Sequence, residues 1–344
     1  MSTRTVRIAT SLACAVTAAL ASGARVASAQ VAGVTGTLII TNKAPFTATI
    51  VDVASGATLA TLPTGVGPHE VVVSIDGKTA VVTDYGTGPQ PVSTLTVIDV
   101  PALKIVRRIS IAPAMRPHGI VFLPGDSLVA VTSEQMRAVV VVSLASGDVV
   151  RTAKTDKAGS HMVGVAADGR RAWTGDIGSN TVTELDLSTG AALRAITVPA
   201  QPEAINVTAD GAEVWVGSNA TGRVSVVSTA TGEVFTAAEG MGWPYRVLFT
   251  PDQSQVFLPD YRNEVVRVLD RASRQERGRI AFTGGGPQGV AISPDGQYVF
   301  VSLSAQARVA VIRVSDRTVV GYVAAGDTPD GVAYTTRVIR VAPR

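Results

Sequence analysis

The stretch PQGVAISPDGQYVFVS, residues 287–302, decides the fold. Runs of alternating character flank Asp295-Gly296, a pair that favours the positive φ angles of a tight hairpin. Two further strand-like runs follow at 308–314 and 318–324, separated by the turn residues 315–317. The segment therefore predicts a unit of four antiparallel strands.

The same unit recurs along the chain with a period of about 42 residues. Each copy begins with Pro, or once with Ser, followed by a polar marker residue. The seven markers are His69, His118, His161, Glu203, Tyr245, Gln288 and Asp330. Four-stranded units repeated in this way predict a β-propeller. A solenoid is the alternative, but it exposes two sheet edges unless polar units cap it, and the sequence has no such unit.

The two ends of the chain complete one another. The last copy, at 329–335, contains only a first strand. Three more strands, which lack a first strand of their own, precede the first copy at 38–41, 47–53 and 58–62. Joining them removes the free edge that an open sheet would expose. We therefore predict an all-β, seven-bladed β-propeller with four-stranded antiparallel blades, its last blade closed by strands from both termini.

Several second strands carry a recurring short motif. Residues 40–42 read Ile-Thr-Asn, 81–84 read Val-Val-Thr-Asp, and 215–218 read Trp-Val-Gly-Ser. With Ser-Pro-Asp-Gly at 293–296 and Val-Ile-Asp at 97–99, they resemble the YVTN-repeat propellers over residues 36–335. The resemblance implies a propeller that is commonly exported, and it implies no particular activity.

Residues 1–29 differ from the rest of the chain. Arg4 and Arg7 precede an apolar run at 8–21, and Ala27-Ser28-Ala29 forms a cleavage pattern, as in a secretory signal peptide. We therefore predict a single mature domain over 30–344 that is secreted or periplasmic. The mature chain has 27 basic and 27 acidic residues once Arg25 and the other two arginines are removed. We accordingly expect no nucleic-acid partner. We also expect no transmembrane segment, and a monomer.

The only three histidines, His69, His118 and His161, occupy the same position in three consecutive units. Repeat symmetry places them side by side at one mouth of the central channel. Imidazoles together with a carboxylate are typical ligands of zinc, copper or manganese. Asp84, Asp176 and Glu203 are the candidate carboxylates, and either Asp is alternatively expected to orient a histidine. Simple polar filling of the channel is the competing interpretation.

Other polar residues extend this candidate site. Tyr245, Gln288 and Asp330 are expected ligand-binding residues of the same ring, and Trp243 and Arg246 are expected at its rim. Trp173, Trp215, Phe257 and Phe300 share a second-strand position that predicts packing between blades.

Three functions remain open from the sequence. The first is a binding protein that holds a metal ion or a small polar ligand at the channel mouth, or a protein partner on its loop face. The second is a metal-dependent lyase or lactonase-like hydrolase, with His161 as the candidate base and Glu203 as the candidate acid. The third is a structural scaffold of the cell envelope.

Overall fold

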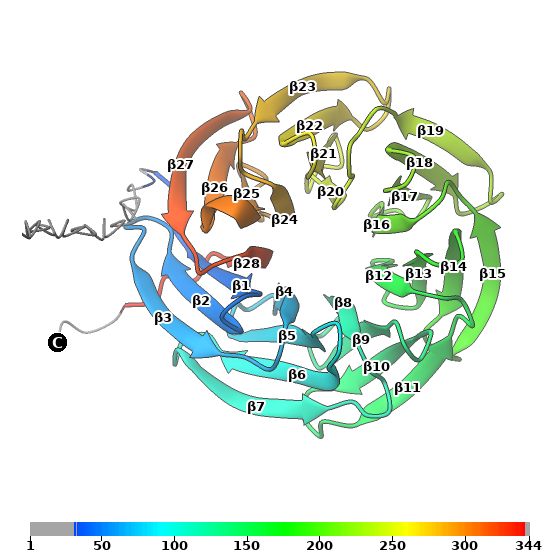
Figure 1. Cartoon of the computed structure of the whole chain (residues 1–344), viewed down its shortest axis with the longest axis horizontal. Coiled ribbons are helices and arrows are strands. Elements are labelled where there is room, and N and C mark those ends of the chain that lie inside the picture. Colours follow the sequence, from blue (N-terminus) through cyan, green and yellow to red (C-terminus); the bar gives the residue numbers. More distant parts are fainter. Residues whose placement is uncertain (1–30, 32, 341–344) are drawn as a thin grey trace, which may run out of the picture.

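The computed structural model describes residues 31 and 33–340, so the predicted signal peptide at 1–29 lies outside the described residues. These residues form seven four-stranded antiparallel sheets, arranged as blades around a central axis (Figure 1). The predicted fold is confirmed. Within the described residues, no helix is long and apolar enough to cross a bilayer.

The strands follow one another from the axis to the perimeter in each blade. Blade 1 contains β4 (Pro68–Val73), β5 (Thr79–Gly86), β6 (Pro91–Asp99) and β7 (Lys104–Ser110). Blade 2 contains β8 (Pro117–Phe122), β9 (Leu128–Ser133), β10 (Ala138–Ser143) and β11 (Val149–Lys154). Blade 3 contains β12 (Ser160–Val165), β13 (Arg171–Asp176), β14 (Thr181–Asp186) and β15 (Ala191–Thr197). Blade 4 contains β16 (Pro202–Val207), β17 (Glu213–Ser218), β18 (Arg223–Ser228) and β19 (Val234–Ala238).

The remaining blades follow the same plan. Blade 5 contains β20 (Leu248–Phe249), β21 (Gln255–Asp260), β22 (Val265–Asp270) and β23 (Glu276–Ala281). Blade 6 contains β24 (Pro287–Ile292), β25 (Tyr298–Leu303), the 3₁₀ turn η1 (Ser304–Gln306), β26 (Arg308–Arg313) and β27 (Thr318–Ala324). Blade 7 contains β28 (Pro329–Thr335), β1 (Thr37–Asn42), β2 (Thr47–Asp52) and β3 (Thr58–Pro63).

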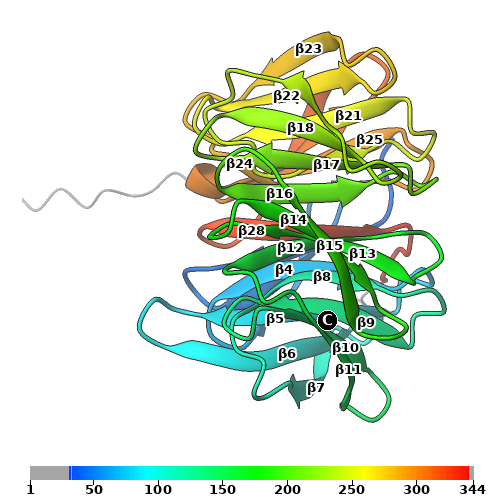
Figure 2. The same ribbon diagram turned by 90° about the vertical axis from the view of Figure 1, so that its right-hand side faces the viewer.

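Blade 7 closes the ring with strands from both ends of the chain. The red strand β28 pairs antiparallel with the blue strand β1, in a register that places Ile39 opposite Ala333 (Figure 1). Seen from the side, β12 and β16 run along the axis while the outer strand β15 crosses them obliquely (Figure 2). This is the twist expected of antiparallel sheets.

The core lies between the blades, in seven clusters that each join two neighbouring sheets. Trp215 and Phe257 contribute to the clusters on either side of blade 5, and Phe300 packs between blades 6 and 7. Burying such side chains contributes roughly 1.5–3 kcal/mol each. Because every cluster needs both of its sheets, the ring of blades stabilises itself as a unit.

Blade 5 departs from the repeat because its first strand, β20, is only two residues long. The chain before it keeps an isolated bridge between Pro244 and Asp260, and the Tyr245 N–H donates to the Pro259 carbonyl. Blade 4 has Gly217 where blade 5 has Pro259. Proline has no N–H to donate, so the ladder between β20 and β21 is interrupted there.

Candidate functional site: a polar cluster on the axis

The three histidines lie together at the starts of β4, β8 and β12. The ring centres of His69 and His118 are 4.8 Å apart, and those of His118 and His161 are 3.7 Å apart. Tyr85 completes the group, with its ring 4.5 Å from that of His69. Because the three histidines hold the same position in consecutive repeats, their rings lie side by side at the axis.

Hydroxyl groups on second strands donate hydrogen bonds to backbone carbonyls of first strands in the neighbouring blades. Thr41 Oγ1 donates to the His69 carbonyl, Thr132 Oγ1 to the His161 carbonyl, and Ser302 Oγ to the Asp330 carbonyl, each over 2.6 Å. Each of these bonds joins one blade to the next. The side chains at the axis are therefore positioned by the same contacts that set the blade spacing.

His161 lies between two carboxylates. Its Nδ1 bonds to Glu134 Oε1, and its Nε2 lies 3.7 Å from Glu203 Oε1. A neutral imidazole has only one N–H, whereas the imidazolium ion has two. Burial opposes the charge, but the hydrogen bond to Glu134 and the nearby charge of Glu203 outweigh it and raise the pKa of His161 to about 9. His161 is therefore a buried cation at neutral pH.

The other two histidines stay neutral. Burial and the nearby Lys43 ammonium lower the pKa of His69 to about 4. Burial and the charge of His161 hold the pKa of His118 well below its ordinary value. The Nδ1 of His69 lies 2.9 Å from the Gly67 carbonyl, which can only accept, so this nitrogen carries the proton and Nε2 carries the lone pair.

Two further ion pairs lie at the axis, one between blades 5 and 1 and one within blade 7. Arg246 of blade 5 pairs with Glu70 of blade 1, and Lys43 Nζ lies 2.7 Å from Asp330 Oδ2. Tyr245 donates to Asp330 Oδ1 over 3.1 Å. We call the charged residues of this region the axial cluster. It comprises Lys43, Glu70, Glu134, His161, Glu203, Arg246 and Asp330.

Asp84 contacts the entry loop of its blade, and Asp176 contacts the strands of its own blade, instead of the histidines that the sequence suggested. Asp84 accepts from the Gly65 N–H, Thr94 and Thr96, and Asp176 accepts mainly from hydroxyl groups of its own blade. Both carboxylates are completely buried. The structure therefore gives them an anchoring role, and no hydrogen bond joins either of them to a histidine within the described residues.

The expected rim residues lie deeper than predicted. Arg246 is 6% exposed, so it is not an accessible rim residue as expected. Trp243 is half-buried and its Nε1 donates to Glu203 Oε2 over 3.1 Å. The Arg262 guanidinium lies 4.7 Å from the Trp243 ring centre. Gln288 is buried at the start of β24.

Sequence reasoning missed a set of residues at the ends of the second strands. Lys43, Tyr85, Glu134 and Asn219 all occupy this position, one residue beyond the set that includes Asp84 and Asp176. Side chains alternate along a strand, so a shift of one residue exchanges the anchoring side chain for the one that faces the axis. Extending the repeat alignment by one residue beyond Asp84 and its equivalents would have identified these four residues. Glu70, which follows a marker histidine, was missed for the same reason.

Several buried polar atoms here have no hydrogen-bond partner among the described residues. They are His118 Nδ1, Asn219 Oδ1, Gln288 Oε1 and Arg246 Nε. Buried polar atoms in native proteins are nearly always bonded, so four of them at one end of the axis need an explanation.

The predicted metal site does not fit this arrangement. A metal ligand must offer a lone pair, but both nitrogens of His161 face carboxylates. Within residues 31 and 33–340, no group of three or more His, Cys, Asp or Glu side chains is arranged to hold a metal ion. We therefore derive no chemistry through a metal.

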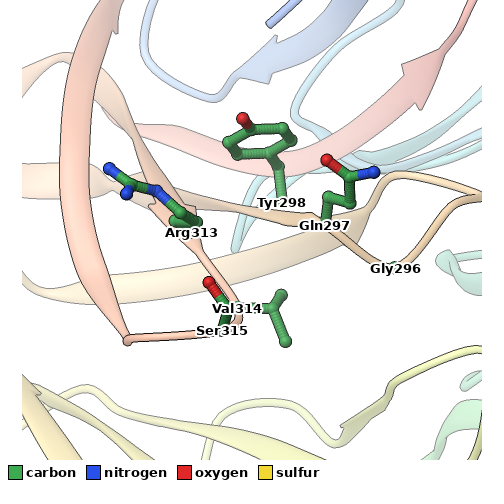
Figure 3. A pocket seen from close by; sticks show the side chains of 6 residues that line it. All are labelled: Gly296, Gln297, Tyr298, Arg313, Val314 and Ser315. Atoms are coloured by element: carbon green, nitrogen blue, oxygen red, sulfur yellow. The ribbon is translucent and has the colours of Figure 1, made fainter. Parts of the chain in front are cut away.

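The surface also has cavities away from this cluster. One of about 330 Å³ lies beside the β24–β25 turn in blade 6 and is lined by Gly296, Tyr298 and Arg313 among others (Figure 3). Another, of about 320 Å³, is lined by Ile75, Phe122 and Val165 with their neighbours. Neither gathers ionisable groups as the axial cluster does.

The fold and the cluster define the class of this protein, a seven-bladed β-propeller with a buried polar cluster on its axis. Hydrazine synthase from Kuenenia stuttgartiensis is similar in structure, with a TM-score of 0.71, 20% identity, and 81% of this chain and 93% of that chain covered. A functionally unknown protein from Desulfotomaculum acetoxidans has a TM-score of 0.71 at 15% identity, covering 87% of this chain and 98% of that one. Likeness at such identities shows the fold alone. No model of a protein family and no curated protein matches the sequence.

Proposed function

We propose that this protein is an exported binding protein that holds a small polar ligand at the axial cluster. The observation that carries the proposal is the set of unpartnered buried atoms on His118, Asn219, Gln288 and Arg246. Leaving one such atom unbonded costs about 1–3 kcal/mol. Several of them at one place form a prepared set of contacts for a ligand.

The state of His161 favours binding over catalysis. A general base needs a free lone pair near its ordinary pKa, and a lyase or lactonase would use His161 in that role. Here Glu134 and Glu203 hold it as an imidazolium ion, and burial with a charged neighbour keeps the pKa of His118 low. A scaffold alone would have no need of unpartnered atoms at the axis.

Export is supported by the sequence of residues 1–29. Arg4 and Arg7, the apolar run at 8–21 and Ala27-Ser28-Ala29 have the three parts of a signal peptide. The resemblance to the YVTN-repeat propellers, whose members are commonly exported, agrees with it. We propose a secreted or periplasmic location on these grounds.

Thermal shift measurements on untagged protein test the binding proposal. The probes are ethanolamine, ethylene glycol, glycolate and the chlorides of zinc, copper and manganese. A bound probe raises Tm in proportion to the logarithm of its concentration over Kd. We expect at least one organic probe to do so, and His118→Phe to weaken its binding at least tenfold.

The matched control is Tyr298→Phe, which removes a polar atom at the cavity shown in Figure 3. Binding should be unchanged in this variant. A protein that responds to none of the probes, or whose His118→Phe variant binds as the wild type does, would contradict the proposal. A response to a metal alone, lost in His118→Phe, would restore the metal interpretation in its place.

A further inference from the structure

Two ion pairs of the axial cluster are balanced in charge. Lys43 neutralises Asp330, and Arg246 neutralises Glu70. The Lys43 ammonium, together with other nearby cations, keeps the pKa of Asp330 below its ordinary value although burial acts in the opposite direction. Burial raises the pKa of Glu70, and the Arg246 guanidinium opposes this effect. With both carboxyl groups ionised, these four residues contribute no net charge.

The third group is not balanced. Glu134 and Glu203 share the single positive charge of His161. Burial would raise their pKa values, but the bonds from His161 lower the pKa of both carboxyl groups, so both are ionised at neutral pH. The nearest further cation, Arg246, lies 3.9 Å from Glu203 and already pairs with Glu70. One negative charge remains in a buried place, where an unpaired charge is costly.

Two of the four unpartnered atoms, Asn219 Oδ1 and Gln288 Oε1, are acceptors. Asn219 Nδ2 donates to Glu203, which leaves Asn219 Oδ1 to accept. The lone pair of His69 Nε2 and the oxygen of Gln288 are further acceptors. Arg246 Nε is an unpartnered donor, and His118 Nδ1 donates or accepts according to its tautomer. A ligand that completes these contacts must itself bring N–H or O–H donors.

Aromatic rings border the same region. The ring centres of Trp243, Tyr245 and Tyr261 lie 5.8–6.3 Å from one another. Aromatic faces attract cations, and two of these rings already contact a guanidinium group of the protein. The surroundings are therefore compatible with a positively charged ligand.

On the basis of the proposed function, we infer that the ligand is a small organic ammonium ion, a protonated primary or secondary amine. Its positive charge balances the excess carboxylate of Glu134 and Glu203. Its N–H groups donate to the acceptors of Asn219, Gln288 and His69. Glu134 has 17% of its side chain exposed, so this carboxylate is in contact with solvent.

Isothermal titration at pH 7 with three probes of similar size tests this inference. Ethanolamine is a cation, ethylene glycol is neutral and glycolate is an anion. We expect ethanolamine to bind at least tenfold more tightly than the other two. At about pH 5.5, where His161 keeps its proton even if its pKa falls toward the ordinary value, Glu134→Gln removes the excess charge at nearly constant size. It should then weaken ethanolamine binding at least tenfold, and the exposed control Glu233→Gln should not change it.

A second variant tests the inference even if Glu134→Gln does not fold. Gln288→Glu adds a negative charge at an unpartnered acceptor and should tighten ethanolamine binding severalfold. If glycolate or ethylene glycol binds more tightly than ethanolamine, or folded Glu134→Gln binds ethanolamine unchanged, the inference fails. Sensitivity of glycolate or glycol binding to His118→Phe would then leave the proposed function standing. Absence of binding by every probe would overturn both.

Discussion

At the scale of single residues, a shift of one position separates anchoring side chains from those of the axial cluster. Asp84 is buried among Thr94, Thr96 and the Gly65 N–H, while its neighbour Tyr85 contacts His69. The residue types at both positions are polar, so composition does not distinguish them. The direction of each side chain follows from strand alternation, and this assigns the role.

We predict that Glu134 controls the titration of His161. Glu134→Gln should lower the pKa of His161 from about 9 toward its ordinary value, because it removes a negative charge that stabilises the imidazolium ion. Side-chain NMR of the histidines between pH 5 and 10 measures it. In the wild type, the stabilisation by His161 is complete below about pH 6.5 and is lost as the pH rises through about 9. An unchanged titration in Glu134→Gln would contradict the geometry described above.

Asp84 should respond to pH in the same direction as His161, but in a more acidic range. Burial raises its pKa to about 6, so the folded protein holds this proton more tightly than the unfolded chain does. Its contribution to stability therefore falls as the pH rises from about 4 to about 6. Asn42 shows that an amide suits this position, since it donates to Thr47 and Thr49 and accepts from the Gly326 N–H.

Two substitutions distinguish charge from hydrogen bonding at Asp84. Asp84→Asn should keep the fold and remove the decline in stability between about pH 4 and 6. Asp84→Ala should cost about 2–4 kcal/mol, since three buried donors lose their acceptor. Urea unfolding at both pH values measures the difference. Equal destabilisation by the two variants would show that the anchoring bonds do not need an acceptor.

At the scale of elements, the first strand is held in position by hydrogen bonds from the neighbouring blade. Its backbone carbonyls at His69, His161 and Asp330 accept from hydroxyl groups of adjacent blades. In blade 5 this strand shortens to β20, because Pro259 cannot donate. The adjacent segment around Tyr245 and Arg246 is then held by side-chain contacts with other blades.

At the scale of the whole molecule, β28 closes the ring. It pairs with β1, and it also packs against β24 and β4 of the neighbouring blades. Its side chain Tyr334 stacks on Phe300 with ring centres 4.7 Å apart. The closing strand therefore joins three blades and leaves β1 without a free edge.

We predict that the ring depends on this strand. A chain that ends at residue 328 should unfold at least roughly 10 °C below the full chain. A synthetic peptide of residues 329–340, added in excess, should restore most of that loss because it pairs with the exposed edge of β1. A peptide of the same composition in scrambled order is the control. Equal rescue by both peptides, or no loss on truncation, would contradict the role of β28.

Local patterns along the chain were enough to predict the seven blades, their four strands and the closure by both termini. These follow from periodic patterns and turn residues, which are local. The sequence also predicted that three histidines share one position in the repeat. Only the tertiary structure decided that His161 lies between Glu134 and Glu203, and that Arg246 reaches Glu70 of blade 1. These contacts join residues far apart in the chain, and their partners depend on the twist and spacing of whole blades, which no local pattern contains.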